Sequence, residues 1–338
     1  MVDSRLKIAL IGCGGIAQAH WQGIQRVATR VDVTAVVDNN PDAANAMAAQ
    51  TGAEAFTDID DALKQGDFQA VDIMLPHDLH ESSALACFDA GKHVLLEKPM
   101  AHSLESAERI LDAGNKVDTV FMIAEQAQYW TDVVKARELM DAGAIGEVIS
   151  ASGNFYDRVV IDADAPPPWR YSLAVSGGGL TIDGGAHWIR PLRMMMGEVE
   201  EVIGVAGHHV PRMEGESWSR MLMKFQNGSV GVLTCQNVMH ASGPTDMFRV
   251  TGTGGEIQIT GGRDGQLILF NKDHPRGESI MNAVEGKMNS YGAEIKDFCE
   301  VVLDGTTMAA PPEYSLGEFR TAQALYKSIE SGRWEKVW

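Results

Sequence analysis

The sequence predicts an α/β protein whose N-terminal part folds as a doubly wound parallel sheet. Short apolar segments alternate with helical patterns over residues 6–124, and this alternation is typical of parallel βαβ units. A glycine-rich turn follows the first of the predicted strands. The chain has 338 residues, more than the ~250–300 over which one core usually stays single, so we expect two domains.

The first strand, 7–11, and the first helix, 18–27, flank a turn of the form G-x-G-x-x-A. In such a turn Gly12 permits the tight bend, Gly14 lets backbone approach a pyrophosphate, and Ala17 allows the helix to pack closely on the strand. The amides at the start of the helix then face the phosphates. We therefore predict a dinucleotide-binding loop formed by Gly12, Cys13, Gly14, Gly15, Ile16 and Ala17.

The second predicted strand, 31–37, is followed by Asp38, a carboxylate that can bind a ribose. Asp38 lies about twenty residues beyond the glycine loop, where a carboxylate can accept hydrogen bonds from the adenosine ribose hydroxyls. A 2′-phosphate would meet like charge there, and the segment 39–42 has no arginine to neutralise it. The expected cofactor is therefore NAD rather than NADP, bound in part by Asp38 and Asn39. A helix-capping role for Asp38 is the alternative.

The N-terminal part continues as alternating helices and strands. Further helices are expected at 41–50, 58–65, 81–90 and 103–114, and further strands at 53–56, 70–75, 94–96 and 119–124. The strand 94–96 runs directly into Glu97, Lys98 and Pro99, and proline stops it because it cannot donate to a sheet ladder. Charge at the carboxyl end of a parallel strand faces the crevice where open α/β sheets bind ligands. Lys98 is therefore expected at that crevice, and a solvated ion pair with Glu97 is the alternative.

Strand patterns dominate the second half of the chain. After a helix at 133–141, strands are expected at 148–156, 201–208, 218–226, 230–238, 246–251, 256–260 and 266–270, and helices at 291–303 and 315–331. Asn227-Gly228 and Gly254-Gly255 are hairpin signals. The proline-rich segment 162–171 predicts a loop, and loops held by rigid scaffolds often carry binding groups. The methionines at 194–196 are expected to pack at a helix end.

One short segment combines glycines with two ionisable side chains. Three glycines at 177–179 precede a predicted helix that carries Asp183 and His187. A spacing of four places both side chains on one helical face, within reach of one substrate. Gly184 and Gly185 each cost roughly 1 kcal/mol in helix propensity, so this helix is expected to serve close approach rather than its own stability. A structural histidine is the alternative to a catalytic one.

Composition disfavours several kinds of partner. With 28 basic and 46 acidic residues the net charge is −18, which opposes binding to nucleic acid or to an anionic membrane. Cys13, Cys87, Cys235 and Cys299 stand far apart without a C-x-x-C pair, so neither a disulfide framework nor a metal site is predicted. The apolar run 8–11 is too short for a signal peptide, and no stretch approaches the ~18 apolar residues of a membrane helix. We expect a cytoplasmic protein.

These motifs together make the chain similar to the glucose-fructose oxidoreductase, inositol dehydrogenase and rhizopine-catabolism (Gfo/Idh/MocA) family. The resemblance covers nearly the whole chain and rests on the glycine loop, the turn 76–80, the segment 91–99 and the segment 177–187. It implies an N-terminal Rossmann domain, 1–125, that binds NAD(P). It also implies a C-terminal α/β domain, 126–338, that binds substrate and has an open, mostly antiparallel sheet. A homodimer or homotetramer would form through that sheet.

The resemblance also implies roles for single residues in redox chemistry at a sugar or polyol carbon. Oxidising a secondary alcohol needs a base within ~3 Å of the hydroxyl oxygen and a cation near the developing alkoxide. His187 would be the base, Lys98 the cation, and Asp183 would bind substrate or orient the histidine. Glu97 would orient or tune Lys98. Further cofactor contacts are expected from Pro76, His77, His80, Glu97, Lys98, Gln126, Trp169 and Arg170, and substrate contacts from Gln128, Tyr156, Arg158 and Tyr171.

Two departures from the family pattern concern the substrate. Residues 126–130, Gln-Ala-Gln-Tyr-Trp, stand where many members carry an asparagine and then an arginine-phenylalanine pair, and neutral amides with aromatics suit an uncharged sugar face. Arg190 and Pro191 stand where the family often has an aspartate. We expect the proline to kink or restart the helix and Arg190 to lie at the surface. An inward Arg190 is the alternative and would favour an acidic substrate.

The predicted function is therefore NAD-dependent transfer of a hydride between a nicotinamide and a secondary alcohol or ketone of a sugar, polyol or related cyclic substrate. Two alternatives remain. An NAD-dependent glycoside hydrolase or lyase would oxidise its sugar only transiently. A regulator of the same fold would bind NAD without turnover, but it would not need Lys98, Asp183 and His187 together.

Overall fold

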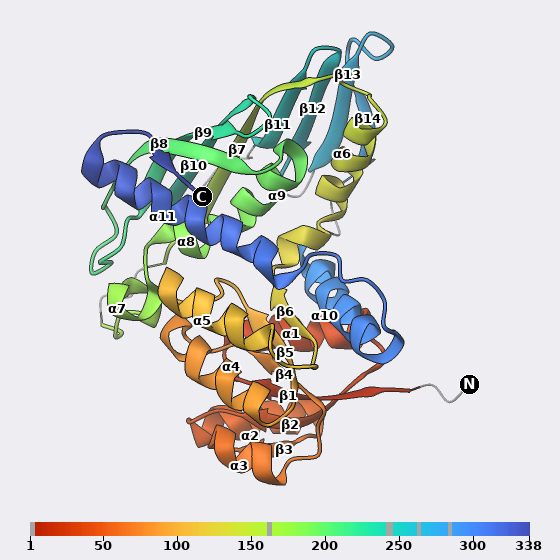
Figure 1. Cartoon of the computed structure of the whole chain (residues 1–338), viewed down its shortest axis with the longest axis vertical. Coiled ribbons are helices and arrows are strands. Elements are labelled where there is room, and N and C mark those ends of the chain that lie inside the picture. The colour runs from red at the N-terminus through yellow and green to blue at the C-terminus, as the bar shows by residue number, and fades with distance from the viewer. Residues whose placement is uncertain (1–3, 161–163, 241–245, 262–264, 283–285) are drawn as a thin grey trace. The chain divides into compact units, whose positions relative to one another are not determined.

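The computed structural model describes residues 4–160, 164–240, 246–261, 265–282 and 286–338 (Figure 1), which form two compact units. Unit 1 contains the described residues up to Gln126 together with Lys287–Leu316, and unit 2 contains those of Ala127–Gly286 and Gly317–Trp338. The expected second domain, 126–338, therefore differs from unit 2 by a segment that returns to unit 1. That segment carries most of the helix α10 (Gly286–Asp304).

Helix α10 belongs to unit 1 because it packs closely on α1 (Gly15–Arg26). A Cβ atom on Gly23 of α1 would lie 2.5 Å from the backbone nitrogen of Gly292, so the two helices approach backbone to backbone. Arg30 and Asp304 form an ion pair nearby, with an Nη1–Oδ2 distance of 2.5 Å. Such long-range contacts leave no local signal in the sequence.

Unit 1 is built on a six-stranded sheet in the order β3-β2-β1-β4-β5-β6. The strands are β1 (Leu6–Ile11), β2 (Val31–Val37), β3 (Glu54–Phe56), β4 (Ala70–Ile73), β5 (His93–Glu97) and β6 (Phe121–Ala124). All neighbouring strands in this order run parallel. The order reverses direction between β1 and β4, which is where doubly wound sheets bind ligands at the carboxyl ends of their strands. The predicted fold class of this part is confirmed.

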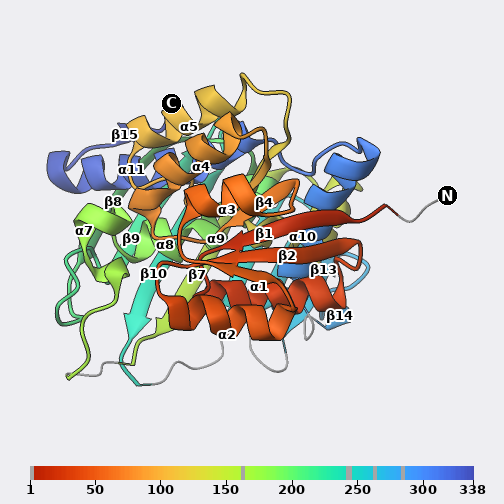
Figure 2. The ribbon, with the colours of Figure 1, turned by 90° about the horizontal axis from the view of Figure 1, so that it is seen from below.

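Helices cover both faces of this sheet. Figure 2 shows α1 and α2 (Pro41–Thr51) on one face, and α3 (Ile59–Gln65), α4 (His80–Asp89) and α5 (Leu104–Gly114) on the other. Local sequence explains several helix starts: the side chains of Asn40, Asp58 and Ser103 accept hydrogen bonds from first-turn amides of α2, α3 and α5. Helix α1 begins three residues earlier than predicted, directly at the glycine turn.

Unit 2 is built on a nine-stranded sheet in the order β14-β13-β12-β11-β7-β10-β9-β8-β15. Its strands are β7 (Val148–Arg158), β8 (Val199–Gly207), β9 (Trp218–Phe225), β10 (Val230–Val238), β11 (Asp246–Gly252), β12 (Gly255–Thr260), β13 (Gln266–Asn271), β14 (Glu278–Asn282) and β15 (Glu335–Lys336). Only β7 and β10 pair in parallel among the strands described in this unit. The mostly antiparallel sheet is confirmed. The short strands β14 and β15 were not predicted, because neither has a period-2 apolar pattern of its own.

The helices of unit 2 are α6 (Thr131–Asp141), α7 (Leu173–Ser176), α8 (Leu180–Asp183), α9 (Ala186–Met196) and α11 (Leu316–Ser331). Helix α9 packs on β7, and the rings of Trp130, Trp188 and Phe248 meet there, with centroids 5.3 Å apart for the two tryptophans. Met195 and Met196 are buried in the same core, which confirms the predicted packing role of the methionine run. Across the described helices of the chain, none combines the length and hydropathy of a membrane span.

Candidate active site

The glycine turn has the geometry that a bound pyrophosphate requires. Gly12 has a φ of +94°, and a Cβ there would lie 2.5 Å from the carbonyl oxygen of Met74, so only glycine fits. A Cβ on Gly14 or Gly15, by contrast, would meet no described atom within 4 Å. Gly14 is the N-cap of α1 and offers the first-turn amides no side-chain partner. The space beside Gly14 and Gly15 is therefore open, as the close approach of a ligand to this backbone requires.

Asp38 lies against this turn. Its Oδ2 atom accepts a hydrogen bond from the Cys13 amide at 2.9 Å, and its Oδ1 atom accepts one from the Asn40 amide at 2.9 Å. The N-cap of α2 is Asn40, so the helix-capping alternative for Asp38 is wrong. Asp38 is half-buried and Asn39 is exposed, which leaves both accessible. An open glycine turn with a carboxylate beside it fits a dinucleotide with a free ribose diol.

The remaining residues of the turn serve packing. Ala17 is fully buried and Ile16 is half-buried. Burial, with Asp38 nearby, raises the pKa of the Cys13 thiol to about 11, so it stays protonated at neutral pH. Cys13 therefore contributes its backbone amide to the loop rather than a reactive thiolate.

The carboxyl end of β4 leads into Pro76 and the short 3₁₀ helix His77–Leu79. His80 follows and is fully buried, and its ring nitrogens lie 2.9 Å from the Leu75 carbonyl oxygen and 3.1 Å from that of Pro99. His77 is buried beside it, with ring centroids 5.6 Å apart. Both ring nitrogens of His80 face backbone carbonyls, so they serve the fold of unit 1; the cofactor contact expected of this residue stays a prediction. His80 ties the end of β4 to the residue after Lys98.

Lys98 follows β5 at the same sheet edge as the glycine turn. Ile73 pairs with both Ile11 and Leu96, so the carboxyl ends of β1, β4 and β5 lie side by side. Glu97 is only 6% exposed, and its Oε2 atom accepts the Lys98 amide hydrogen at 2.9 Å. The alternative of a solvated pair is therefore wrong for Glu97. Lys98 itself is half-buried.

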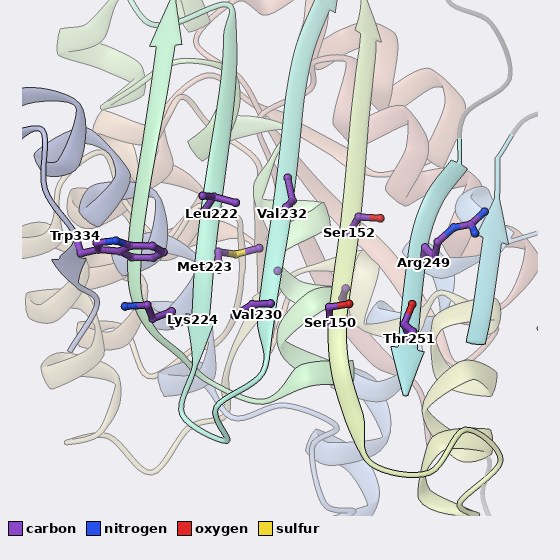
Figure 3. A pocket seen from close by; sticks show the side chains of 12 residues that line it. Ser150, Ser152, Leu222, Met223, Lys224, Val230, Val232, Arg249, Thr251 and Trp334 are labelled. Atoms are coloured by element: carbon purple, nitrogen blue, oxygen red, sulfur yellow. The ribbon is translucent and has the colours of Figure 1, made fainter. Parts of the chain in front are cut away.

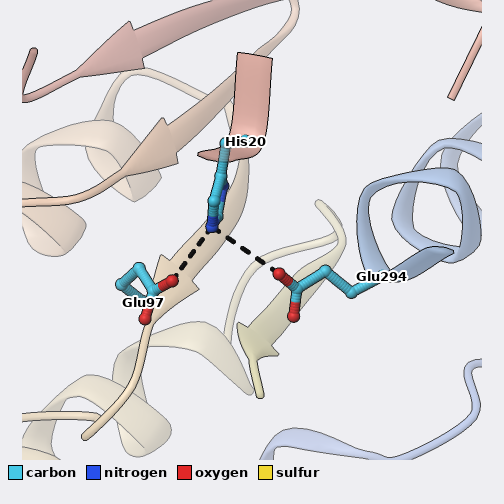
Figure 4. Close-up of side chains that lie close together, drawn as sticks. All are labelled: His20, Glu97 and Glu294. Atoms are coloured by element: carbon cyan, nitrogen blue, oxygen red, sulfur yellow. Dashed lines mark hydrogen bonds and ion pairs between the residues drawn. The ribbon is translucent and has the colours of Figure 1, made fainter. Parts of the chain in front are cut away.

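A buried cluster behind Lys98 was missed by the sequence analysis. His20 of α1 is fully buried, with Nδ1 at 2.8 Å from Asp72 Oδ2 and Nε2 at 2.9 Å from Glu97 Oε1. Its Nε2 atom also lies 3.6 Å from Glu294 Oε1 of α10 (Figure 4). Two signals could have found it: His20 lies three residues after the sheet-facing Ala17, and Asp72 lies within a buried strand.

Burial and ion pairing have opposite effects on the charge of His20 in this cluster. Burial opposes a charged imidazole, but the ion pair with Asp72 and the hydrogen bonds to Asp72 and Glu97 outweigh it and raise the pKa of His20 well above its usual value. Burial likewise raises the pKa of Glu294. Gln126, predicted to contact cofactor, is buried at the end of unit 1, and its Oε1 atom accepts a hydrogen bond from the Ser290 hydroxyl at 2.6 Å.

In unit 2, the predicted helix with Asp183 and His187 is two helices. Helix α8 ends at Asp183 and α9 begins at Ala186, because the Gly185 amide bonds five residues back to Leu180. Both intervening glycines keep right-handed helical dihedrals, so the spacing of four still places the two side chains about one turn apart. Both are half-buried.

The glycines between them are needed for close approach, as predicted. A Cβ on Gly184 would lie 2.3 Å from the Phe155 ring, and one on Gly185 would lie 2.4 Å from the Thr181 carbonyl oxygen. The junction between α8 and α9 therefore rests directly on β7. This fixes where Asp183 and His187 lie on the sheet.

The proline-rich loop contributes a cation to this pair. Trp169–Tyr171 forms a short 3₁₀ helix, and the Arg170 guanidinium lies 4.3 Å from the centroid of the Trp169 ring. Arg170 Nε also lies 3.2 Å from Asp183 Oδ2. The structure therefore brings together three predicted site residues. Residues 162 and 163 of the predicted loop lie outside the described residues.

The predicted substrate residues lie in different surroundings. Tyr156 and Arg158 are exposed near the end of β7. Tyr171 is half-buried, and burial raises its pKa. Gln128 is half-buried and its Oε1 atom accepts a hydrogen bond from Arg190 Nη1 at 3.0 Å.

The expectation that Arg190 lies at the surface is wrong, and Pro191 does not restart the helix. Helix α9 continues through Pro191 to Met196 without restarting. Arg190 is 1% exposed, and its Nε atom lies 2.6 Å from Glu318 Oε1 of α11. Glu318 also pairs with Arg193. Because Glu318 neutralises it, the buried Arg190 does not indicate an acidic substrate.

The fold and the glycine turn define a dinucleotide-binding α/β protein of two units, and comparison with known proteins identifies the family. Residues 6–125 match the oxidoreductase family with an NAD-binding Rossmann fold, and residues 133–258 match the GFO/IDH/MocA C-terminal domain. The chain therefore belongs to the Gfo/Idh/MocA family of oxidoreductases, as its motifs predicted.

Two curated relatives are named as dehydrogenases of levoglucosan and of myo-inositol. The chain is 26% identical to levoglucosan dehydrogenase of Pseudarthrobacter phenanthrenivorans, over 85% of this chain and 82% of the relative. It is also 26% identical to myo-inositol 2-dehydrogenase of Thermotoga maritima, over 98% of each chain. Among solved structures, a levoglucosan dehydrogenase complex with NADH and levoglucosan superposes with a TM-score of 0.89 at 23% identity, covering 99% of both chains.

Proposed function

We propose that this oxidoreductase transfers a hydride between NAD and a secondary alcohol or ketone of a sugar, polyol or related cyclic substrate. The observation that carries the proposal is the placement of Asp38 and Lys98 at the sheet edge that holds the open glycine turn. Asp183 and His187, one turn apart in unit 2, supply the acid–base groups. The names of the levoglucosan and myo-inositol relatives support the substrate class.

NAD⁺ held by the glycine turn and Asp38 supplies the hydride acceptor when bound. His187 removes the proton of the substrate hydroxyl as a general base, and in the reverse direction it returns the proton as a general acid. Lys98 stabilises the negative charge that develops on the substrate oxygen. Asp183, with Arg170 as its ion-pair partner, orients the substrate or the His187 ring.

An uncharged polyol suits the described side chains of unit 2. The Gln128 oxygen accepts a hydrogen bond from Arg190, so its amide NH₂ remains to donate to a hydroxyl. Tyr156, Arg158 and Tyr171 offer further donors and an apolar ring face. Cofactor contacts from Trp169 and from Pro76 are part of the same proposal.

Asp38→Ser is expected to raise the KM for NAD⁺ by roughly 10- to 100-fold, because it removes a charged acceptor for the ribose hydroxyls. The KM for NADP⁺ should fall, since like charge no longer opposes the 2′-phosphate. Initial rates with each cofactor measure this change. The control is Asp42→Ser, at an exposed acid of α2. An unchanged KM for NAD⁺ would contradict the assigned ribose contact.

The function itself is tested by following NADH absorbance with a panel of polyols, aldoses, glycosides and sugar acids. Accumulation of NADH with a polyol or sugar supports the dehydrogenase. Product without accumulated NADH would identify transient oxidation by a hydrolase or lyase. Cofactor binding without any product would identify a regulator.

The sheet of unit 2 leaves one face suited to a second copy of this chain. Leu222 and Val232 pair across β9 and β10 and are 49% and 39% exposed, and Val230 beside them is 49% exposed. These side chains line a concave region of about 480 Å³ that extends to Trp334 (Figure 3). A contiguous apolar surface on a sheet is typical of an interface between subunits. We infer a homodimer or homotetramer formed through this face.

Val232→Lys is expected to convert the oligomer to monomer, because a cation buried in an apolar interface costs several kcal/mol. Sedimentation velocity measures the change in mass. The matched control is Val134→Lys, at a valine of α6 with 38% exposure. A wild-type monomer, or a Val232→Lys variant with unchanged mass, would contradict this interface.

The remaining partner and location proposals rest on charge and on thiols. The net charge of −18 opposes nucleic acid and anionic membranes as partners. All four cysteines are free, buried thiols, which suits a reducing compartment, and we infer a cytoplasmic location.

A further inference from the structure

We propose that His20 is a positioning residue that holds the Glu97 carboxylate, and through it the backbone of Lys98, in the geometry needed for hydride transfer. The inference rests on the proposed function, because Lys98 matters only if it contacts a reacting oxygen. His20 lies in the first helix, outside the segments that carry the proposed catalytic groups. Its role becomes visible only in the folded unit 1.

A continuous chain of hydrogen bonds leads from the sheet interior to Lys98. Asp72 lies within β4 and accepts from His20 Nδ1 at 2.8 Å. The opposite ring nitrogen of His20 contacts Glu97 Oε1 at 2.9 Å (Figure 4). The second oxygen of Glu97, Oε2, accepts the Lys98 amide hydrogen at 2.9 Å. Both Glu97 oxygens are therefore engaged, which fixes the carboxylate plane.

Only the imidazolium form of His20 satisfies both carboxylates. A neutral imidazole donates from one nitrogen, so either Asp72 or Glu97 would face a lone pair. His20 and Asp72 are 0% exposed and Glu97 is 6% exposed, and a buried carboxylate without a donor is costly. His20 is thus a buried cation that bridges two carboxylates, Asp72 of β4 and Glu97 of β5.

His20 holds Glu97, the residue before Lys98, and a second buried histidine holds Pro99, the residue after it. His80 of α4 faces the carbonyl oxygen of Pro99 at 3.1 Å, directly after Lys98. Both neighbours of Lys98 are therefore held by a buried histidine. His20 contacts the side chain of Glu97, and His80 contacts the backbone carbonyl of Pro99. Rigid flanks restrict where a flexible lysine side chain can place its ammonium, and misplacement by 1 Å can cost about 10²-fold in rate.

The test compares His20→Asn with His20→Gln. The amide nitrogen of asparagine lies near the position of Nδ1 and can donate to Asp72, whereas that of glutamine lies near Nε2 and can donate to Glu97. Each variant loses the charge and one donor, so they are matched for the number of lost contacts. Positioning predicts that only the glutamine variant retains the orientation of Glu97.

We expect kcat to fall at least about tenfold in His20→Asn and to stay within about threefold of wild type in His20→Gln. The dissociation constant for NAD⁺, measured by calorimetry, should stay within about threefold of wild type in both, because the glycine turn is untouched. Crystal structures should show the Glu97 carboxylate displaced in His20→Asn and unchanged in His20→Gln. This structural readout does not depend on activity.

Equal kcat values in the two variants, or an unmoved Glu97 in both crystal structures, would overturn the proposal. Stoichiometric zinc or manganese in the purified wild-type protein would also overturn it, because the ligand atoms of His20, Glu97 and Glu294 lie within 4.8 Å of one another and His20 would then be a metal ligand. A wild-type protein without hydride transfer on any substrate would instead contradict the proposed function, and the crystal structures would still decide whether His20 positions Glu97.

Discussion

Replacing His187 by asparagine is expected to lower kcat by about 10²- to 10⁴-fold, because the variant cannot take the proton from the substrate hydroxyl. The dissociation constant for NAD⁺ should not change, since the variant leaves the glycine turn and Asp38, which are proposed to hold the cofactor, untouched. Steady-state kinetics on the substrate identified in the panel, together with calorimetry for NAD⁺, measure the two quantities.

A matched control is His274→Asn, which changes a partly exposed histidine of unit 2 that pairs with Glu278. It should leave kcat within about twofold of wild type, as expected for an exposed ion pair. Retention of wild-type kcat by His187→Asn would remove His187 from the proposed mechanism. It would leave Asp183, one turn away, as the base to test next.

Replacing Glu318 by glutamine is expected to lower the free energy of unfolding by about 3–5 kcal/mol, because two buried arginines lose their common counter-ion. Arg190 and Arg193 are 1% and 2% exposed, and both contact Glu318. Glu198 continues to pair with Arg193, so Arg190 bears most of the loss. The midpoint of urea unfolding monitored in unit 2, with its tryptophans as probes, measures the change.

The control for this stability change is Glu330→Gln on the same helix, where the side chain is exposed. It should change the free energy of unfolding by less than about 0.5 kcal/mol. A change of less than about 0.5 kcal/mol in Glu318→Gln as well would contradict the prediction, because it would mean that Arg190 and Arg193 do not depend on Glu318 as their counter-ion. Because Arg190 also holds Gln128, the Glu318 variant should in addition raise the KM for the substrate.

The N-terminal fold was predictable because its signals are local and agree with one another. Each βα step combines a short apolar run, a turn residue and a helix start within about twenty residues. The glycine turn could be identified for the same reason, since the constraint on Gly12 arises from its immediate connection between strand and helix. Asp38 and Lys98 were located correctly because both lie at strand ends, and parallel strands end at one edge.

The errors concern residues whose environment depends on distant segments. The contacts of the buried His80 ring were not predicted, because one ring nitrogen faces the carbonyl oxygen of Pro99, nineteen residues away. Arg190 was expected at the surface, but it is buried and forms an ion pair with Glu318, 128 residues away in the chain. The helix 291–303 was expected in the second domain. It belongs to unit 1, where its backbone at Gly292 packs against Gly23 of α1.

The sequence by itself determined the fold class, the family, the dinucleotide turn and the set of Lys98, Asp183 and His187 as candidates for chemistry. Only the tertiary structure decided which of the surrounding polar groups are buried and with whom they pair: His20 with Asp72 and Glu97, and Arg190 with Glu318. The reason is physical. Periodicity and turn residues act over a few neighbours, whereas the desolvation of a charge is set by whatever segment packs against it, however far away in the chain that segment lies.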